Sequence, residues 1–157
     1  MWEVLGGSQL KAEASQAERP VSKDLTGRIL LVDDDPHFLR VLSRILSGEK
    51  FQVTSASAAC EAIELLQASA FDLVICDLRM PECDGLNVLQ EVRRGGSEVP
   101  VIILTAYGEV DTYLEAMNAG AAEYLNKPIN SDELLKIVRC CLHNRNARQN
   151  NRRAKSA

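Results

Sequence analysis

The stretch 72-DLVICDLRMPECDG-85 joins an apolar run of four residues to a carboxylate, and a Met-Pro pair follows after two intervening residues. The run Leu73–Cys76 has the length and composition of a strand that is buried on both faces, as is usual in a parallel sheet. Asp77 follows it directly. A single aspartate at a strand end is common in turns, so its meaning depends on the residues that end the other apolar runs.

Short apolar runs alternate with segments of helical periodicity from Gly27 onward. We predict strands at 28–32, 51–54, 73–76, 101–104 and 122–125. We predict helices that begin at Pro36, after Ser57 as N-cap, at Leu86, at Glu109 and at Asn130, which has capping-box spacing. Such alternation indicates right-handed crossovers and a parallel sheet covered on both faces. The predicted fold class is α/β, a doubly wound five-stranded parallel sheet with five helices, over residues 27–142.

Composition is that of an ordinary globular protein. Of 157 residues, 46% are apolar and 25% are charged, which is enough for a sizeable core. The apolar stretches reach about five residues, far short of the roughly 20 that cross a bilayer, and the first residues lack the apolar segment of a secretory signal. Five cysteines without a C-x-x-C pair argue against a disulfide framework or a zinc site and favour a reducing cytoplasm.

Charge is distributed unevenly along the chain. Residues 27–138 hold 9 basic and 18 acidic residues, a net charge of −9, whereas residues 139–157 hold six basic residues and no acid. We predict a flexible leader over 1–26 and a basic tail over 143–157. We interpret the tail as a solvated extension of the last helix, in preference to a contact with nucleic acid or membrane phosphates. It is too short for a helix-turn-helix.

The residues that end four of the strands are polar. They are Asp33-Asp34-Asp35, Asp77, Thr105 and Lys127. In doubly wound sheets, ligands bind beyond the carboxyl ends of the strands, where the strand order reverses. Carboxylates crowded at one edge raise each other's pKa, and Mg²⁺ relieves this cost by accepting carboxylates together with water and phosphate oxygens. A carboxylate there can attack phosphorus, while an ammonium and a hydroxyl bind the transferred group.

Four motifs resemble those of the receiver domain of bacterial two-component response regulators. They are Val32-Asp33-Asp34, Asp77-Leu-Arg-Met80-Pro81-x-x-Asp84-Gly85, Leu104-Thr105-Ala106 and Lys127-Pro128, in the order and at the spacing of that family. The resemblance covers residues 27–142. It implies a flavodoxin-like sheet of strand order 2-1-3-4-5 and a cytoplasmic protein of phosphorelay signal transduction.

The resemblance also implies a role for each motif residue. Asp77 corresponds to the phosphoacceptor, and Asp33 and Asp34 to the acidic pair that holds Mg²⁺, with Asp34 the preferred direct ligand. Further metal ligands are Asp77 and the backbone carbonyl of Arg79. Thr105 and Lys127 correspond to the catalytic hydroxyl and lysine, Thr105 and Tyr124 to the switch pair, and the Lys127-Pro128 bond is expected to be cis. Asp35 is assigned to the loop or to water-mediated support.

By this resemblance, the chain accepts a phosphoryl group on Asp77 from a sensor histidine kinase or a phosphotransfer protein. Phosphorylation then switches a face that binds an unidentified downstream protein. The chain is a signalling phosphoacceptor that catalyses its own phosphorylation and dephosphorylation, not a turnover enzyme. We expect no binding of nucleic acid or membrane by the domain itself. Homodimerisation on phosphorylation stays open, as does whether the chain is a single-domain regulator or part of a larger one.

Three other functions fit these residues less well. A phosphatase with an aspartyl nucleophile commonly carries a second acid two residues later, where this chain has Arg79. A flavin or dinucleotide binder needs a Gly- or hydroxyl-rich loop after the first strand, whereas three aspartates there would repel a phosphate unless a metal intervened. An adaptor that works without phosphorylation would leave the full set of strand-end residues unexplained.

Overall fold

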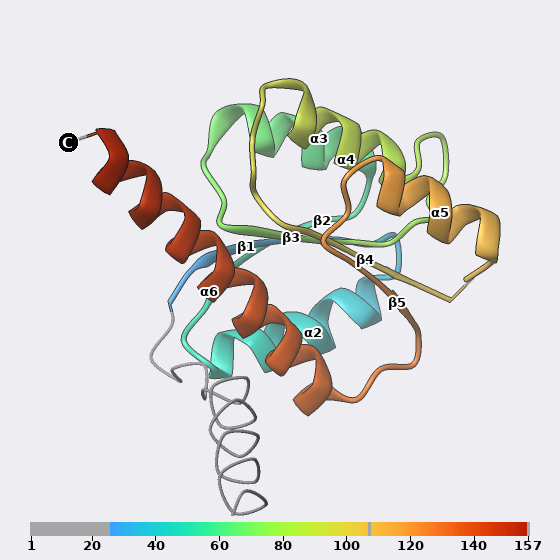
Figure 1. Ribbon diagram of the computed structural model, residues 1–157. Coiled ribbons are helices and arrows are strands. Elements are labelled where there is room, and N and C mark those ends of the chain that lie inside the picture. Colours follow the sequence, from blue (N-terminus) through green and yellow to red (C-terminus); the bar gives the residue numbers. More distant parts are fainter. Residues whose placement is uncertain (1–25, 107, 157) are drawn as a thin grey trace, which may run out of the picture.

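The computed structural model describes residues 26–106 and 108–156, so nearly all of the predicted leader lies outside the described residues. One parallel sheet has the strand order β2-β1-β3-β4-β5 (Figure 1). Its strands are β1 (Arg28–Val32), β2 (Gln52–Ala56), β3 (Leu73–Cys76), β4 (Val101–Thr105) and β5 (Glu123–Asn126). The predicted fold class and strand order are confirmed.

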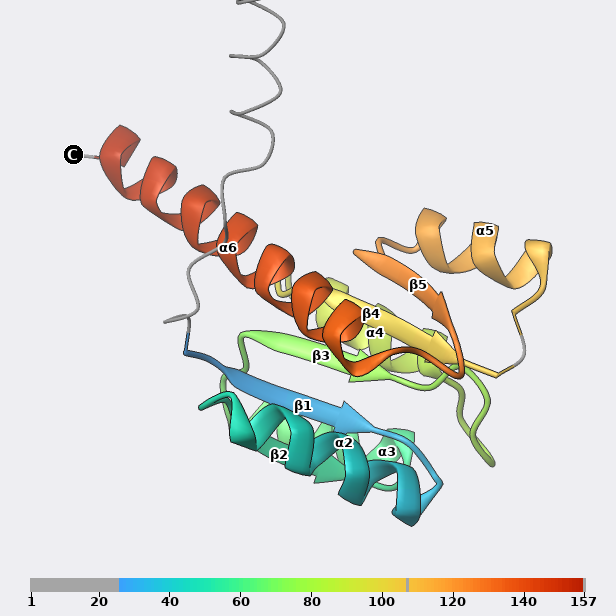
Figure 2. The ribbon, with the colours of Figure 1, turned by 90° about the horizontal axis from the view of Figure 1, so that it is seen from below.

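Helices cover both faces of the sheet (Figures 1 and 2). On one face lie α2 (Pro36–Gly48) and α6 (Ser131–Ser156), and on the other lie α3 (Ala59–Ala68), α4 (Gly85–Arg94) and α5 (Val110–Asn118). Alternate residues of β1 enter two separate cores, because Ile29 and Leu31 face α2 and α6 whereas Leu30 and Val32 face the other helices. Burial on both faces explains why the central strands β1, β3 and β4 are mostly apolar runs, whereas β2 and β5 at the two edges are partly exposed.

Two helix starts show how local side chains set the boundaries. Asp35 is the N-cap of α2, and its carboxylate accepts the N–H groups of His37 at 2.9 Å and Phe38 at 3.3 Å. Asp35 therefore supports the loop directly, as an N-cap. At α6, the Asn130 side chain accepts the N–H of Asp132 at 2.8 Å, which agrees with the predicted cap.

The prediction that Ser57 caps the next helix was wrong. The N-cap of α3 is Ala58, which makes no side-chain cap. Strand β2 continues to Ala56, two residues beyond the predicted end, and this places Ser57 before the cap position. Its N–H and hydroxyl instead bind the Glu61 carboxylate at 2.9 and 3.1 Å.

The basic residues at the end of the chain continue α6 without a break, as far as Ser156. This agrees with the interpretation of the tail as an extension of the last helix. The last buried residue of α6 is Leu142. Beyond it, Arg145 pairs with Asp72, and Arg152 lies 2.7 Å from Glu98. Within residues 26–106 and 108–156, no helix is both long enough and apolar enough to span a bilayer.

Candidate functional site

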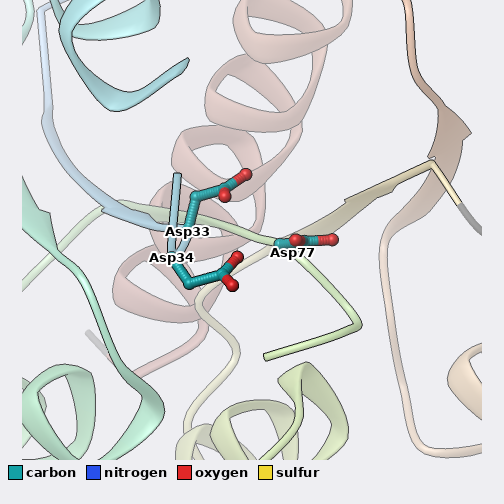
Figure 3. Close-up of side chains that lie close together, drawn as sticks. All are labelled: Asp33, Asp34 and Asp77. Carbon is teal, nitrogen blue, oxygen red and sulfur yellow. The ribbon is translucent and has the colours of Figure 1, made fainter. Parts of the chain in front are cut away.

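Three aspartates meet where the neighbouring strands β1 and β3 end (Figure 3). Asp33 and Asp34 follow β1, and Asp77 follows β3. One carboxylate oxygen of each residue lies within 4.8 Å of the other two. Asp33 and Asp77 are buried, with 3% and 8% of their surface exposed, whereas Asp34 is exposed. The adjacency of the two strands thus gathers acids that are more than forty positions apart in the sequence.

Lys127, directly after β5, brings a positive charge to these acids. Its Nζ lies 2.5 Å from Oδ2 of Asp33 and 3.8 Å from Oδ2 of Asp77. The other oxygen of Asp33, Oδ1, accepts the N–H of Asp35 at 2.9 Å. Both oxygens of Asp33 therefore have partners within the protein, which leaves Asp34 and Asp77 the better placed to bind something else.

The surroundings of Asp77 disfavour its charged form. Burial has the largest effect and raises the pKa of its carboxyl group. Lys127 and the Arg79 N–H lower this pKa, whereas the charges of Asp33 and Asp34 raise it. The net shift is upward. Among the described residues, Oδ1 of Asp77 is buried and has no hydrogen-bond partner. A buried carboxylate oxygen without a partner is costly. Carboxylate oxygens are the ligands that hard cations such as Mg²⁺ prefer.

A cavity of about 640 Å³ opens over these residues and is lined by the loop between β3 and α4. Asp84 caps α4 by accepting the N–H groups of Leu86 and Asn87 at 3.0 and 3.2 Å. The next residue, Gly85, has no room for a side chain, because a Cβ there would lie 2.3 Å from the carbonyl oxygen of Asp77. The Asp84-Gly85 motif thus holds the start of α4 against the backbone of Asp77.

Thr105 and Tyr124 lie on the neighbouring strands β4 and β5. Thr105 is fully buried, and its carbonyl accepts the N–H of Lys127 at 2.8 Å. The hydroxyl of Tyr124, which is half-buried, lies 2.8 Å from the hydroxyl of Thr112 on α5. The Tyr124 ring also packs edge-on against Tyr113, at 5.5 Å between centroids. Two contacts with α5 therefore hold the Tyr124 side chain in place.

Thr112 is a residue that the sequence interpretation missed. Its hydroxyl donates to the carbonyl of Glu109 at 2.9 Å and accepts the Glu109 N–H at 3.3 Å. A hydroxyl has a single hydrogen to donate, so Tyr124 is the donor in its bond with Thr112. Its capping-box position, three residues after Glu109, was the sequence signal that could have revealed it.

Replacing Thr112 with valine is expected to destabilise the protein by about 1–2 kcal/mol, because the Tyr124 hydroxyl loses its acceptor. Urea unfolding measures this change. Thr112→Ser keeps the hydroxyl and is the matched control, with an expected loss of less than half that size. Equal losses in the two variants would contradict a role for the hydroxyl.

The response regulator receiver domain family matches residues 29–139. The chain belongs to this family. Among curated relatives, the transcriptional regulatory protein ZraR of Klebsiella oxytoca is 41% identical over 118 residues, 74% of this chain and 27% of ZraR. The alginate biosynthesis transcriptional regulatory protein AlgB of Pseudomonas aeruginosa is 46% identical over 108 residues, 69% of this chain and 24% of AlgB. This receiver chain thus spans about a quarter of the length of these relatives.

Solved structures agree with the receiver fold. A CheY-like response regulator receiver domain protein from Methanospirillum hungatei superposes with a TM-score of 0.76 at 28% identity, covering 79% of this chain and 99% of that one. NtrX from Brucella abortus superposes with a TM-score of 0.77 at 26% identity, covering 83% of this chain and 30% of NtrX.

The receiver motifs predicted from the sequence come together at one edge of the sheet. Asp33, Asp34, Asp77 and Lys127 form a single cluster, and Arg79 lines the cavity beside it. The Lys127-Pro128 bond is cis, as expected.

Proposed function

We propose that this receiver accepts a phosphoryl group on Asp77 from the phosphohistidine of a sensor kinase or a phosphotransfer protein. The observation that carries the proposal is the position of Asp77, which is buried beside two acids and a lysine, with one carboxylate oxygen that has no partner among residues 26–106 and 108–156. A phosphoacceptor must present one carboxylate oxygen to an incoming phosphorus while positive charge stands close by. Asp77 has both properties.

The acidic cluster fits Mg²⁺, because its donors are carboxylates, one of them with a buried oxygen that finds no hydrogen-bond partner in the described part of the chain. Asp34 and Asp77 would hold the ion directly, with the backbone carbonyl of Arg79. Asp33 would support them from behind, since its two oxygens already bind Asp35 and Lys127. When bound, the ion supplies positive charge that offsets the repulsion among the carboxylates and the phosphoryl oxygens.

Asp77, Lys127 and Thr105 each have a separate role in the phosphoryl transfer. An oxygen of Asp77 forms a bond to phosphorus, and the bond from phosphorus to the donor's imidazole nitrogen breaks with its electron pair leaving on the nitrogen. Lys127, whose ammonium stands 3.8 Å from Asp77, compensates the charge of the transferred oxygens. The Thr105 hydroxyl binds one of them after transfer. Hydrolysis by water returns Asp77 as a carboxylate and releases inorganic phosphate.

In this proposal, phosphorylation of Asp77 changes the surface formed by α5 and β5. Thr105 would transmit the change at Asp77 toward Tyr124, which contacts α5 through Thr112 and Tyr113. Exposed apolar side chains run along α5 at helical spacing: Val110, Tyr113, Leu114 and Met117. A stripe of this kind is suited to a protein partner. We therefore propose that phosphorylation of Asp77 alters the face formed by α5 and β5 and thereby its affinity for a downstream protein.

The curated relatives are named transcriptional regulatory proteins and are much longer than this chain. We propose a cytoplasmic receiver over residues 27–142, followed by a basic helical extension over 143–157. The output is carried by a protein partner or by a further domain, not by contacts of the receiver with nucleic acid or membrane.

Incubation of the purified chain with acetyl phosphate tests the proposal. With Mg²⁺ present, intact mass is expected to rise by one phosphoryl group, and peptide mapping is expected to place it on Asp77. With a chelator in place of the metal, the mass is expected to stay unchanged. Absence of labelling under both conditions, or a phosphoryl group on another residue, would contradict the proposed function.

A further inference from the structure

Lys127 has a third neighbour besides Asp33 and Asp77. Its Nζ lies 4.0 Å from the centroid of the Phe38 ring, well inside the roughly 6 Å over which an ammonium is attracted to an aromatic face. The Lys127 side chain is only 18% exposed, and cation–π attraction is strongest where water is excluded. We propose that Phe38 is a positioning residue, which holds the Lys127 ammonium in place for reaction at Asp77. This inference rests on the proposed function.

The chain fixes Phe38 in this position through the start of α2. Asp33 accepts the N–H of Asp35 at 2.9 Å, and the Asp35 carboxylate in turn caps α2 by accepting the N–H of Phe38 at 3.3 Å. The Phe38 ring then lies under Lys127, whose ammonium returns to Asp33. These contacts form a closed ring of four residues. The side chain of Phe38 is half-buried against the core between α2 and α6, which limits its movement.

An aromatic face suits this position because it attracts the ammonium without using a directed hydrogen bond. Lysine has three N–H donors, and Asp33 engages one of them at 2.5 Å. The ring holds the charge near Asp77 and displaces water that would compete for it. The remaining donors stay available for Asp77 and for the oxygens of an incoming phosphoryl group. A leucine would fill much of the same volume but would exert no such attraction.

The competing explanation is that Phe38 only fills space in the core. The two explanations differ in what they predict for a ring of nearly constant size with altered charge distribution. Adding fluorine atoms to a phenyl ring weakens the negative face that attracts a cation, while shape changes little. A residue that only fills space would respond to truncation and hardly to fluorination.

The first test measures the rate of labelling by acetyl phosphate with Mg²⁺ in chains of residues 1–157 that carry one, two or three fluorines on Phe38. We expect the rate to fall stepwise with each fluorine, and Phe38→Leu to be about three- to tenfold slower than the wild type. Phe38→Tyr retains an aromatic face and is expected to stay within about twofold of the wild type. Rates that are independent of fluorination would overturn the inference.

The second test needs neither metal nor phosphodonor, so it separates this inference from the proposed function. Urea unfolding of the wild type, Phe38→Leu, Lys127→Met and the double variant forms a double-mutant cycle. We expect the two changes to be non-additive by about three- to tenfold in the unfolding equilibrium constant. Additive changes in a chain that acetyl phosphate labels would overturn the role of Phe38. Non-additive changes in a chain that is never labelled would instead overturn the proposed function.

Discussion

Asp77→Asn is expected to abolish labelling by acetyl phosphate, because an amide lacks the nucleophilic carboxylate oxygen. The same change is expected to stabilise the metal-free protein at neutral pH. The folded structure raises the pKa of Asp77, chiefly through burial, so folding disfavours the carboxylate that the amide replaces. Loss of a reaction together with a gain in stability is the pattern expected of a functional residue held in unfavourable surroundings.

The sign of this stability effect depends on pH. Because the pKa of Asp77 is higher in the folded chain than in the unfolded one, the charged form penalises folding once the pH exceeds the folded pKa. The penalty disappears as the pH falls below the pKa of Asp77 in the unfolded chain, because the carboxyl group is then protonated in both the folded and the unfolded state. The advantage of the asparagine variant is therefore expected at neutral pH and should shrink in acid, as urea unfolding at several pH values would reveal.

Asp111→Asn is a matched control for both effects. Asp111 lies in the first turn of α5, is exposed and does not line the acidic cavity. Its replacement removes the same charge and is expected to leave labelling unchanged and stability within about 0.5 kcal/mol. Labelling that survives in Asp77→Asn, or that disappears in Asp111→Asn, would contradict the assignment of Asp77.

Gly85→Ala is expected to destabilise the protein by about 2–3 kcal/mol and to slow labelling at Asp77. The new Cβ would lie 2.3 Å from the Asp77 carbonyl oxygen and 3.1 Å from the Cα of Leu78. Both are backbone atoms, which cannot rotate away as the end of a side chain can, so α4 or the end of β3 must move. Thermal or urea unfolding measures the loss, and the initial rate of mass increase measures the effect on Asp77.

Gly95→Ala, at the other end of the same helix, is the control. Gly95 has a φ of −85°, and a Cβ there would meet no atom within 4 Å. Alanine is expected to be neutral or to stabilise the chain by about 0.4–1 kcal/mol, because it restricts the unfolded state without straining the folded one. Equal losses at Gly85 and Gly95 would show that helix propensity, not the contact with Asp77, sets the cost.

The sequence was sufficient for the fold because its central strands β1, β3 and β4 are buried on both faces. Short apolar runs such as those of β3 and β4 fit a strand that is buried on both faces, and segments of helical periodicity lie between these runs. Short-range details were harder to foresee. The error at Ser57 arose because β2 is partly exposed, so its end has no apolar signal and was placed two residues early.

For the candidate site, the sequence could name the polar residues at the strand ends, but not the side chains that hold them. Asp33, Asp34, Asp77 and Lys127 each follow a strand of the parallel sheet, and the strand order brings them together. Phe38 and Thr112 lie on helices, at positions where an aromatic ring or a hydroxyl is unremarkable. Their contacts with Lys127 and Tyr124 depend on how α2 and α5 are rotated against the sheet, and a periodic pattern does not specify that rotation.

The unbroken course of α6 has a mechanical consequence. A helix of 26 residues is about 39 Å long at 1.5 Å per residue, and its first half is anchored in the core through Leu134, Leu135, Val138 and Leu142. The second half therefore acts as a stiff lever whose direction is set by the sheet. A domain attached to the end of α6 would have a fixed orientation relative to the sheet. Inserting one residue into the second half of α6 would rotate that domain by about 100° about the helix axis.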